Sequence, residues 1–193
     1  AWIQELGHTK MVPQTDGEPA LHSLIGAVAA QLSTIDGISQ VSVRQSPAGS
    51  HQSKGTAERT VQTLRNMARI YIRHLELNVP GLIVGADSPW WSWAVRHASW
   101  VYNRFHKRSD SPTTAYEKYR WRRYGQPILE LGECVMARGP AAALASKGAA
   151  HELLALWLGL DALTDDHIVV TGAGVFRTRM VRRVVKEQQW NSI

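Results

Sequence analysis

Cysteine is nearly absent from the sequence, since Cys134 is the only one in 193 residues. A single thiol excludes internal disulfide bonds and any zinc site that needs several thiolates. There is also no run of eighteen apolar residues and no signal-peptide pattern, so we expect a soluble intracellular protein with no membrane contact. The chain starts at Ala1 and its first methionine is Met11, which favours a piece of something longer.

Acidic residues are scarce in the middle of the chain. Residues 44–125 hold fourteen Lys and Arg but five Asp and Glu, a net charge of +9, whereas residues 1–43 carry −3 and residues 126–193 carry zero. A local basic excess favours contact with a polyanion such as nucleic acid. A solvated basic surface explains the charge equally well.

The hydrophobic pattern predicts alternating strands and helices in the first part of the chain. Residues 9–16 predict a short strand and turn, residues 19–33 a helix, and residues 38–46 a strand with imperfect alternation. A long helix is predicted over roughly residues 56–77. Another helix follows Ser88-Pro89, with serine as N-cap and proline at the first helical position. This order indicates an α/β fold.

The pattern changes near residue 126, where we place a domain boundary between residues 1–125 and residues 126–193. The segments ECVMAR, LLALWLGL, HIVVT and VFRTRMVRRVV predict strands, and Gly172-Ala173-Gly174 predicts a hairpin turn. We expect these strands to form a small β-barrel-like module. The segment VFRTRMVRRVV is expected to be one strand, with its apolar and basic residues on opposite sides: Phe176, Met180 and Val184 against Arg177, Arg179 and Arg183. Arg177 and Arg179 are candidate DNA contacts, although protection of an exposed strand edge explains them as well.

Four polar residues of the predicted long helix share one face. Glu58, Gln62, Arg65 and Arg69 are spaced by four, three and four residues, and this face is predicted to lie opposite most of the apolar stripe. Such a face could hold a cation at Glu58 and DNA phosphates at Arg65 and Arg69. The spacing alone favours a simpler alternative, a solvated face on which the helix dipole stabilises an acid near the N-terminus.

A divalent cation needs further oxygen ligands, and Asp16 is the best partner for Glu58. Asp16 follows a predicted strand and precedes a predicted helix. Two-metal phosphoryl transfer uses ions about 4 Å apart to activate the attacking oxygen and stabilise the leaving one. A turn role is the alternative, because Asp-Gly is a common turn pair, and Glu18 is close enough to compete for the assignment.

These segments resemble a known family. TDGE, a helix, a strand and then SPAGSHQSKGTAERTVQTLRN look like the retroelement integrase core, a member of the retroviral-integrase and DDE-transposase superfamily. Downstream, WAVRHASWVYNRFHKRSDSPTTAYEKYRWRRYGQP resembles the helix and tail of retrotransposon integrases, so the resemblance spans roughly residues 9–127. More weakly, WLGLDALTDDHIVVTGAGVFRTRMVRRV resembles the small SH3-like module that follows the core in some retrotransposon polyproteins.

The resemblance implies an RNase H-like fold with three acidic ligands for Mg²⁺ or Mn²⁺. Asp16 matches the family's second aspartate and Glu58 its glutamate. Residues 1–15 contain no aspartate, so the first has no counterpart here and catalytic activity stays open. The chain thus resembles the second half of a catalytic core plus a C-terminal module, and the resemblance reverses the preference for a merely solvated helix face.

We therefore expect a fragment of an integrase, a DNA-binding polynucleotidyl transferase for metal-dependent DNA integration that is inactive alone. One alternative is a non-catalytic DNA-binding or interaction remnant of a decayed retrotransposon. Another is a small-barrel module, residues 126–193, that contacts chromatin or another subunit. The expected partners are DNA, further copies of the chain and the remainder of a polyprotein or integrase, in the nucleus if the host is eukaryotic.

Overall fold

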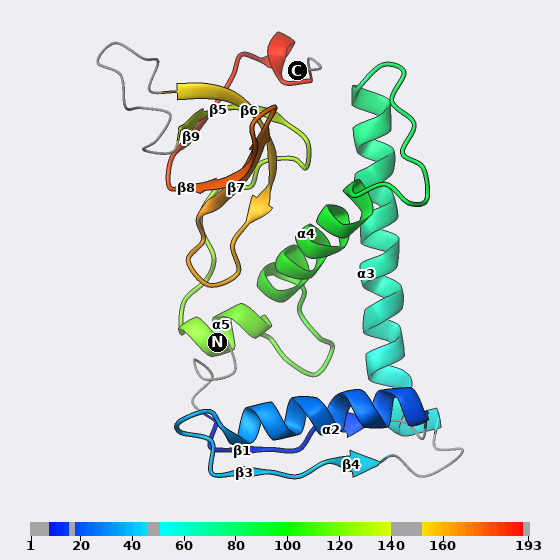
Figure 1. Cartoon of the computed structure of the whole chain (residues 1–193). Helices are drawn as coiled ribbons and strands as arrows, with labels where there is room; N and C mark the ends of the chain where they lie inside the picture. The colour runs from blue at the N-terminus through cyan, green and yellow to red at the C-terminus, as the bar shows by residue number, and fades with distance from the viewer. Residues whose placement is uncertain (1–7, 16–17, 46–50, 140–151, 191–193) are drawn as a thin grey trace. The chain divides into compact units, whose positions relative to one another are not determined.

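The computed structural model describes residues 8–15, 18–45, 51–139 and 152–190 (Figure 1). The chain divides into two compact units, residues 1–61 and residues 62–193, and each is described by itself below as the first and the second unit. Helix α3 (His51–Asn78) supplies residues to both, and it starts earlier than the predicted residue 56. The domain boundary predicted near residue 126 lies inside the second unit and stays a prediction.

The first unit is a strand–helix–strand arrangement, as predicted. Its strands pair in parallel, β1 with β3 and β2 with β4, with α2 between the two paired segments. The helix predicted over residues 19–33 has these bounds in the structure. The described elements are β1 (Lys10–Met11), β2 (Gln14–Thr15), α2 (Pro19–Ser33), β3 (Gln40–Val41) and β4 (Arg44–Gln45).

Each of the two predicted strands is divided in two because of a proline. The backbone N–H groups of Ser42 and Arg44 donate to the carbonyl oxygens of Met11 and Pro13 at 3.0 and 2.8 Å, so the segments stay aligned between the strand pairs. Pro13 has no N–H and gives no hydrogen bond in return. The two short pairs are therefore one parallel pairing interrupted at Pro13.

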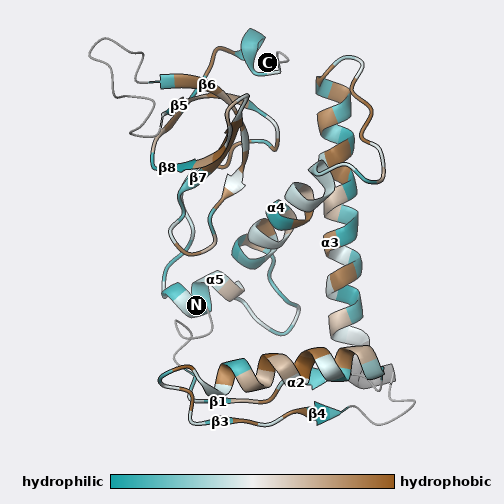
Figure 2. Cartoon of the chain, in the orientation of Figure 1, coloured by the Kyte–Doolittle hydropathy of each residue, from teal (hydrophilic) through white to brown (hydrophobic). Residues whose placement is uncertain are grey.

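Little of the first unit is buried. Among its described residues only Thr15 and Leu32 are buried, whereas Val12 is 59% and Leu24 is 58% exposed. Figure 2 shows that α2 is hydrophobic along much of its length. Parallel strands are normally covered on both faces, so the described part of this unit leaves apolar surface uncovered.

The second unit combines helices with an antiparallel sheet of strand order β8-β7-β6-β5-β9. Besides its part of α3, it contains α4 (Trp90–Phe105), α5 (Ala115–Arg120), β5 (Cys134–Arg138), β6 (Glu152–Leu160), β7 (His167–Thr171), β8 (Gly174–Thr178), β9 (Val181–Arg183) and the 3-10 helix η2 (Lys186–Gln188). The predicted hairpin turn lies between β7 and β8. Pro89 is the N-cap of α4 rather than its first residue, which corrects the start by one position. No described helix is both long and apolar enough to cross a membrane.

The predicted β-barrel is an open sheet instead. In the part of the chain that the structure describes, β8 and β9 form opposite edges and do not pair with each other. Only Arg179 and Met180 separate them along the chain, so the Cα atoms of Thr178 and Val181 lie no more than about 11 Å apart. The sheet must therefore curve until its edges approach each other, as Figure 1 shows.

The strand predicted for VFRTRMVRRVV is likewise divided, into β8 and β9, and the reason is the phase of its side chains. Phe176 and Val181 both pack against the core of the sheet. A separation of five residues would put them on opposite faces of a straight strand, so the chain must bend between them. Met180, predicted to share the inner face with Phe176, lies in this bend and is exposed.

Trp157 of β6 is the centre of the main core. It is fully buried in one cluster with Trp100 of α4, Val135 of β5 and Val169 of β7. Its Nε1 donates to Nδ1 of His167 at 3.1 Å. Because α4 contributes Trp100, residues on both sides of the predicted boundary near 126 share this core.

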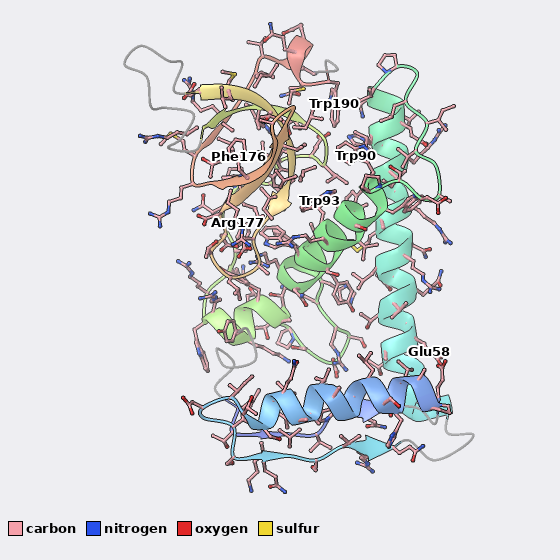
Figure 3. The ribbon with its side chains drawn as sticks, viewed as in Figure 1. Glu58, Trp90, Trp93, Phe176, Arg177 and Trp190 are labelled. Atoms are coloured by element: carbon pink, nitrogen blue, oxygen red, sulfur yellow. The ribbon has the colours of Figure 1, made fainter. Side chains whose placement is uncertain are left out.

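A second cluster joins α3 to the start of α4. Ala68 and Ile72 pack with Ala94 and Leu131, and Trp90, Trp91 and Trp93 surround them (Figure 3 labels Trp90 and Trp93). The predicted apolar stripe of α3 is thus buried from Ala68 onward. Trp90, Trp91 and Trp93 therefore contribute to the packing of this second cluster.

His97 and Cys134 are two of the buried titratable residues of the second unit. The ring of His97 is 4.9 Å from that of Tyr71 and 5.3 Å from that of Trp157, and burial lowers the pKa of His97 to about 4. Cys134 is fully buried at the start of β5. Burial, with the nearby charge of Glu133, raises the pKa of its thiol.

Candidate nucleic-acid interface

The predicted metal ligands belong to the first unit. Asp16 lies outside the described residues, so its approach to Glu58 stays a prediction. Glu58 is an exposed residue of α3 (Figure 3). Within the described ranges, no group of three His, Cys, Asp or Glu is arranged to hold a metal ion. A divalent cation at Glu58 would therefore need Asp16 and at least one further ligand.

The polar residues that follow on α3 belong to the second unit and are exposed. Nε2 of Gln62 and Nη1 of Arg69 both donate to Oδ1 of Asn66, at 3.1 and 3.2 Å. Neither Arg65 nor Arg69 forms an ion pair with any described residue. Arg73 of the same helix differs, because its Nη1 lies 3.3 Å from Oε2 of Glu76. The two candidate arginines thus keep a positive charge that no described carboxylate compensates.

The face formed by Gln62, Arg65 and Arg69 lies beside the buried stripe of α3 and not opposite to it. At roughly 100° per residue, its centre is turned by roughly 90° from that of the buried residues Ala68, Ile72 and Leu75. The predicted opposition of the two faces is therefore wrong. Arg65 and Arg69 therefore lie at the edge of the buried face of α3.

The charges of Arg177 in β8 and of Arg179, which follows β8, are each compensated by a nearby carboxylate. Nη1 of Arg177 (Figure 3) lies 3.4 Å from Oδ2 of Asp161, and Nε of Arg179 lies 3.9 Å from Oδ1 of Asp166. Both arginine side chains are largely exposed, so each pair contributes little to stability. The nearby carboxylates nevertheless reduce the positive potential here. DNA contact by these two residues stays a prediction.

Asp161 connects the sheet to α4. Burial alone would raise the pKa of its carboxyl group, but hydrogen bonds from the N–H groups of Leu163 and Thr164, at 3.0 and 3.2 Å, lower it, as do the charges of Arg177 and Arg96. The net result is a pKa below the ordinary value. Asp161 therefore stays ionised and keeps both arginines near it.

Sequence reasoning missed the role of Arg104. This buried residue of α4 lies with its guanidinium carbon 4.0, 4.9 and 5.4 Å from the ring centroids of Trp100, Tyr116 and Tyr124. Its Nη2 donates to Oδ1 of Asp165 at 2.7 Å. Arg104 therefore holds together α4, α5 and the loop after β6, and it is not available to a ligand.

A basic segment covers the end of α5 and the residues directly after it. It is exposed at Lys118, Arg120, Trp121, Arg122 and Arg123. The sequence signal that could have singled it out is a tryptophan between arginines in KYRWRR. Periodicity does not reveal such a site, because the segment crosses the end of a helix of six residues.

Comparisons with known proteins give a distant likeness. No family model and no curated protein matches the chain. Among solved structures, it is similar to one described as the cryoEM structure of simian T-cell lymphotropic virus intasome in complex with PP2A regulatory subunit B56 gamma, with a TM-score of 0.43 and 17% sequence identity. The alignment covers 95% of this chain and 61% of that one, so this chain spans less than two thirds of the matched chain.

Proposed function

We propose that the chain is the DNA-binding part of a retroelement-type integrase, a metal-dependent polynucleotidyl transferase. The observation that carries the proposal is the pair Arg65 and Arg69, exposed on one face of α3 with no described carboxylate to compensate either charge. The resemblance of residues 9–127 to integrase cores and the net charge of +9 in residues 44–125 support it.

The spacing of these two arginines suits a nucleic-acid backbone. They are one helical turn apart, which is about 6 Å along the axis. Each DNA strand carries a phosphate about every 3.4 Å of its axis, so two guanidinium groups at this spacing reach two phosphates of one strand. Guanidinium groups also bind phosphate oxygens in pairs of parallel hydrogen bonds. Backbone contacts of this kind position DNA without reading its sequence.

Asp16 and Glu58 are proposed as ligands of Mg²⁺ or Mn²⁺. A bound divalent ion would supply Lewis-acid activation of a phosphoryl oxygen. Carboxylate oxygens are the donors that these ions prefer. Glu58 is exposed and thus reachable by an ion and by DNA. With two of the three acidic ligands, the chain is expected to bind DNA without joining it.

Salt dependence tests the DNA-binding part of the proposal. Duplex DNA carrying a fluorophore is titrated with the full chain at several salt concentrations, and binding is followed by anisotropy. Arg65→Ala with Arg69→Ala should flatten the slope of log affinity against log salt by roughly 1.8 units, about 0.9 for each phosphate contact. Arg73→Ala is the matched control, because Glu76 already pairs with Arg73. An unchanged slope in the double variant would refute the contact.

Metal binding is tested separately. Mn²⁺ is titrated calorimetrically into the full chain, into Asp16→Asn and into Glu58→Gln, with Asp87→Asn as the control for loss of an exposed carboxylate. Both ligand variants should weaken binding, and the control should not. If the chain binds DNA while Mn²⁺ affinity is the same in all four proteins, the non-catalytic DNA-binding alternative is correct.

A further inference from the structure

Trp121 is unusual in both exposure and backbone conformation. It is 91% exposed and directly follows α5. Its φ of 56° and ψ of 19° lie in the left-handed region, where a bulky side chain is strained and glycine is the usual residue. Its N–H donates to the carbonyl oxygen of Glu117 at 3.0 Å, so the backbone alone ends the helix. Among the described residues, no other ring stacks on the indole.

The charges next to Trp121 are almost all positive. Lys118 and Arg122 are exposed and form no ion pair within the described ranges. Arg120 donates to the carbonyl oxygen of Leu163 at 3.2 Å. Nε of Arg123 lies 3.0 Å from Oε1 of Glu117, the one acid of this segment. An exposed aromatic ring therefore lies within three residues, along the chain, of four cations, one of which is paired.

We propose that Trp121, Lys118 and Arg122 form a second nucleic-acid site, which binds an unpaired base. The base stacks on the indole, and the two cations contact the flanking phosphates. Aromatic rings bind single strands in this way because every base has a free π-face once it leaves the duplex. The site lies outside α3 and does not depend on Arg65 or Arg69, so it goes beyond the proposed function.

The charge pattern favours nucleic acid over a protein partner. Tryptophan and arginine are also frequent at the centres of protein interfaces. A protein ligand would have to offer several carboxylates to Lys118, Arg120 and Arg122 together, whereas a nucleic-acid strand supplies a negative charge at each nucleotide. The strained conformation also favours a ligand role, since strained residues cluster at functional sites.

The test uses the full chain and a fluorescent oligothymidine, with anisotropy measured over a range of salt. Trp121→Ala should weaken binding by roughly 5- to 150-fold, the range for loss of one stacked base, with an unchanged salt slope because no charge is lost. Trp121→Phe should restore most of the affinity. Lys118→Ala with Arg122→Ala should instead flatten the slope by roughly 1.4 units, about 0.7 for each phosphate contact to a single strand.

Two controls separate binding from folding. Ile83→Ala removes another apolar side chain that is 87% exposed and should leave affinity unchanged. Trp121→Gly removes the ring and relieves the backbone, so its Tm should equal or exceed that of the unchanged chain while its affinity falls.

Three results would overturn the site. The first is unchanged oligothymidine affinity in Trp121→Ala. The second is an equal loss for oligothymidine and for a blunt duplex, which would show that the ring does not select unpaired bases. The third is unchanged oligothymidine affinity of Trp121→Ala together with a smaller particle mass than that of the unchanged protein by light scattering, which would assign Trp121 to a protein interface. Since Arg65 and Arg69 are intact in these variants, duplex binding reports on the α3 site independently.

Discussion

The two units differ in how they bury their hydrophobic residues. The second unit surrounds Trp157 with side chains from α4, β5 and β7. The first unit buries only Thr15 and Leu32 among its described residues, although α2 is largely apolar (Figure 2). Hydrophobic burial is the main favourable term in folding. The second unit therefore has a hydrophobic core that stabilises its fold, whereas the described part of the first unit has none of comparable extent. The proposed DNA contacts lie on the unit with the core, and the proposed metal ligands lie on the other.

The largest expected effect follows from truncating the centre of the main core. Trp157→Ala should lower the free energy of unfolding by about 3–5 kcal/mol, because it leaves a cavity and removes the hydrogen bond to His167. Urea unfolding followed by circular dichroism measures the change. Leu24→Ala in α2 is the matched substitution in the first unit, and it should change the free energy by less than about 0.5 kcal/mol because the side chain is exposed. A loss of comparable size for Leu24→Ala would show that α2 is covered, and the contrast between the units would disappear.

Acid should destabilise the second unit through His97. The pKa of His97 is about 4 in the folded chain and about 6.5 when unfolded, so the folded state disfavours the proton. Its contribution is therefore fully present above pH 6.5 and is lost as the pH falls to about 4, a change of about 3 kcal/mol. Burial also lowers the pKa of His167, which acts in the same direction.

Urea unfolding at intervals between pH 7 and pH 4 measures this loss. His97→Phe should flatten the pH dependence in that window. The matched variant in the first unit is His22→Phe, at an exposed position of α2, and it should leave the dependence as it was. If the free energy of unfolding of His97→Phe fell with pH as steeply as that of the unchanged chain, the loss of stability in acid would not be due to His97.

The smallest effect concerns a helix cap. The side chain of Thr114 accepts from the N–H of Glu117 at 3.1 Å, and the Glu117 carboxylate accepts from the N–H of Thr114 at 2.7 Å. Thr114→Ala should cost about 1 kcal/mol. Ser33→Ala in α2 should be close to neutral, since the hydroxyl of Ser33 only donates back to the carbonyl oxygen of Ala29 and caps nothing. Thermal unfolding of the two variants makes the comparison, and equal shifts in Tm would contradict it.

Local patterns predicted the elements well where chemistry marks their ends. The bounds of α2 were predicted correctly because Pro19 starts it and an apolar period of helical spacing continues to Leu32. The cap of α5 follows from the Thr-Ala-Tyr-Glu sequence, which has the spacing of a capping box. Such signals depend only on neighbours along the chain.

Features that depend on distant residues were missed. The bend between β8 and β9 was missed because Phe176 and Val181 pack against a core that other strands and α4 supply. The ion pair of Arg177 with Asp161 and the aromatic surroundings of Arg104 join segments far apart in sequence. The structure leaves Arg65 and Arg69 exposed on α3, and their contact with DNA stays a prediction. Sequence reasoning did not foresee that Arg177 and Arg179 lie next to acids.

The buried position of Cys134 makes this residue a natural probe of local opening in the second unit. Because it is the only cysteine in the chain and its side chain is fully buried, a thiol reagent can modify it only after the surrounding structure opens locally. At high reagent concentration, the labelling rate therefore equals the opening rate, and at low concentration it reports how often the open form is present. Intact-mass spectrometry of one added label thus measures the rate or the population of local opening around Cys134, with no engineered probe and no change of sequence.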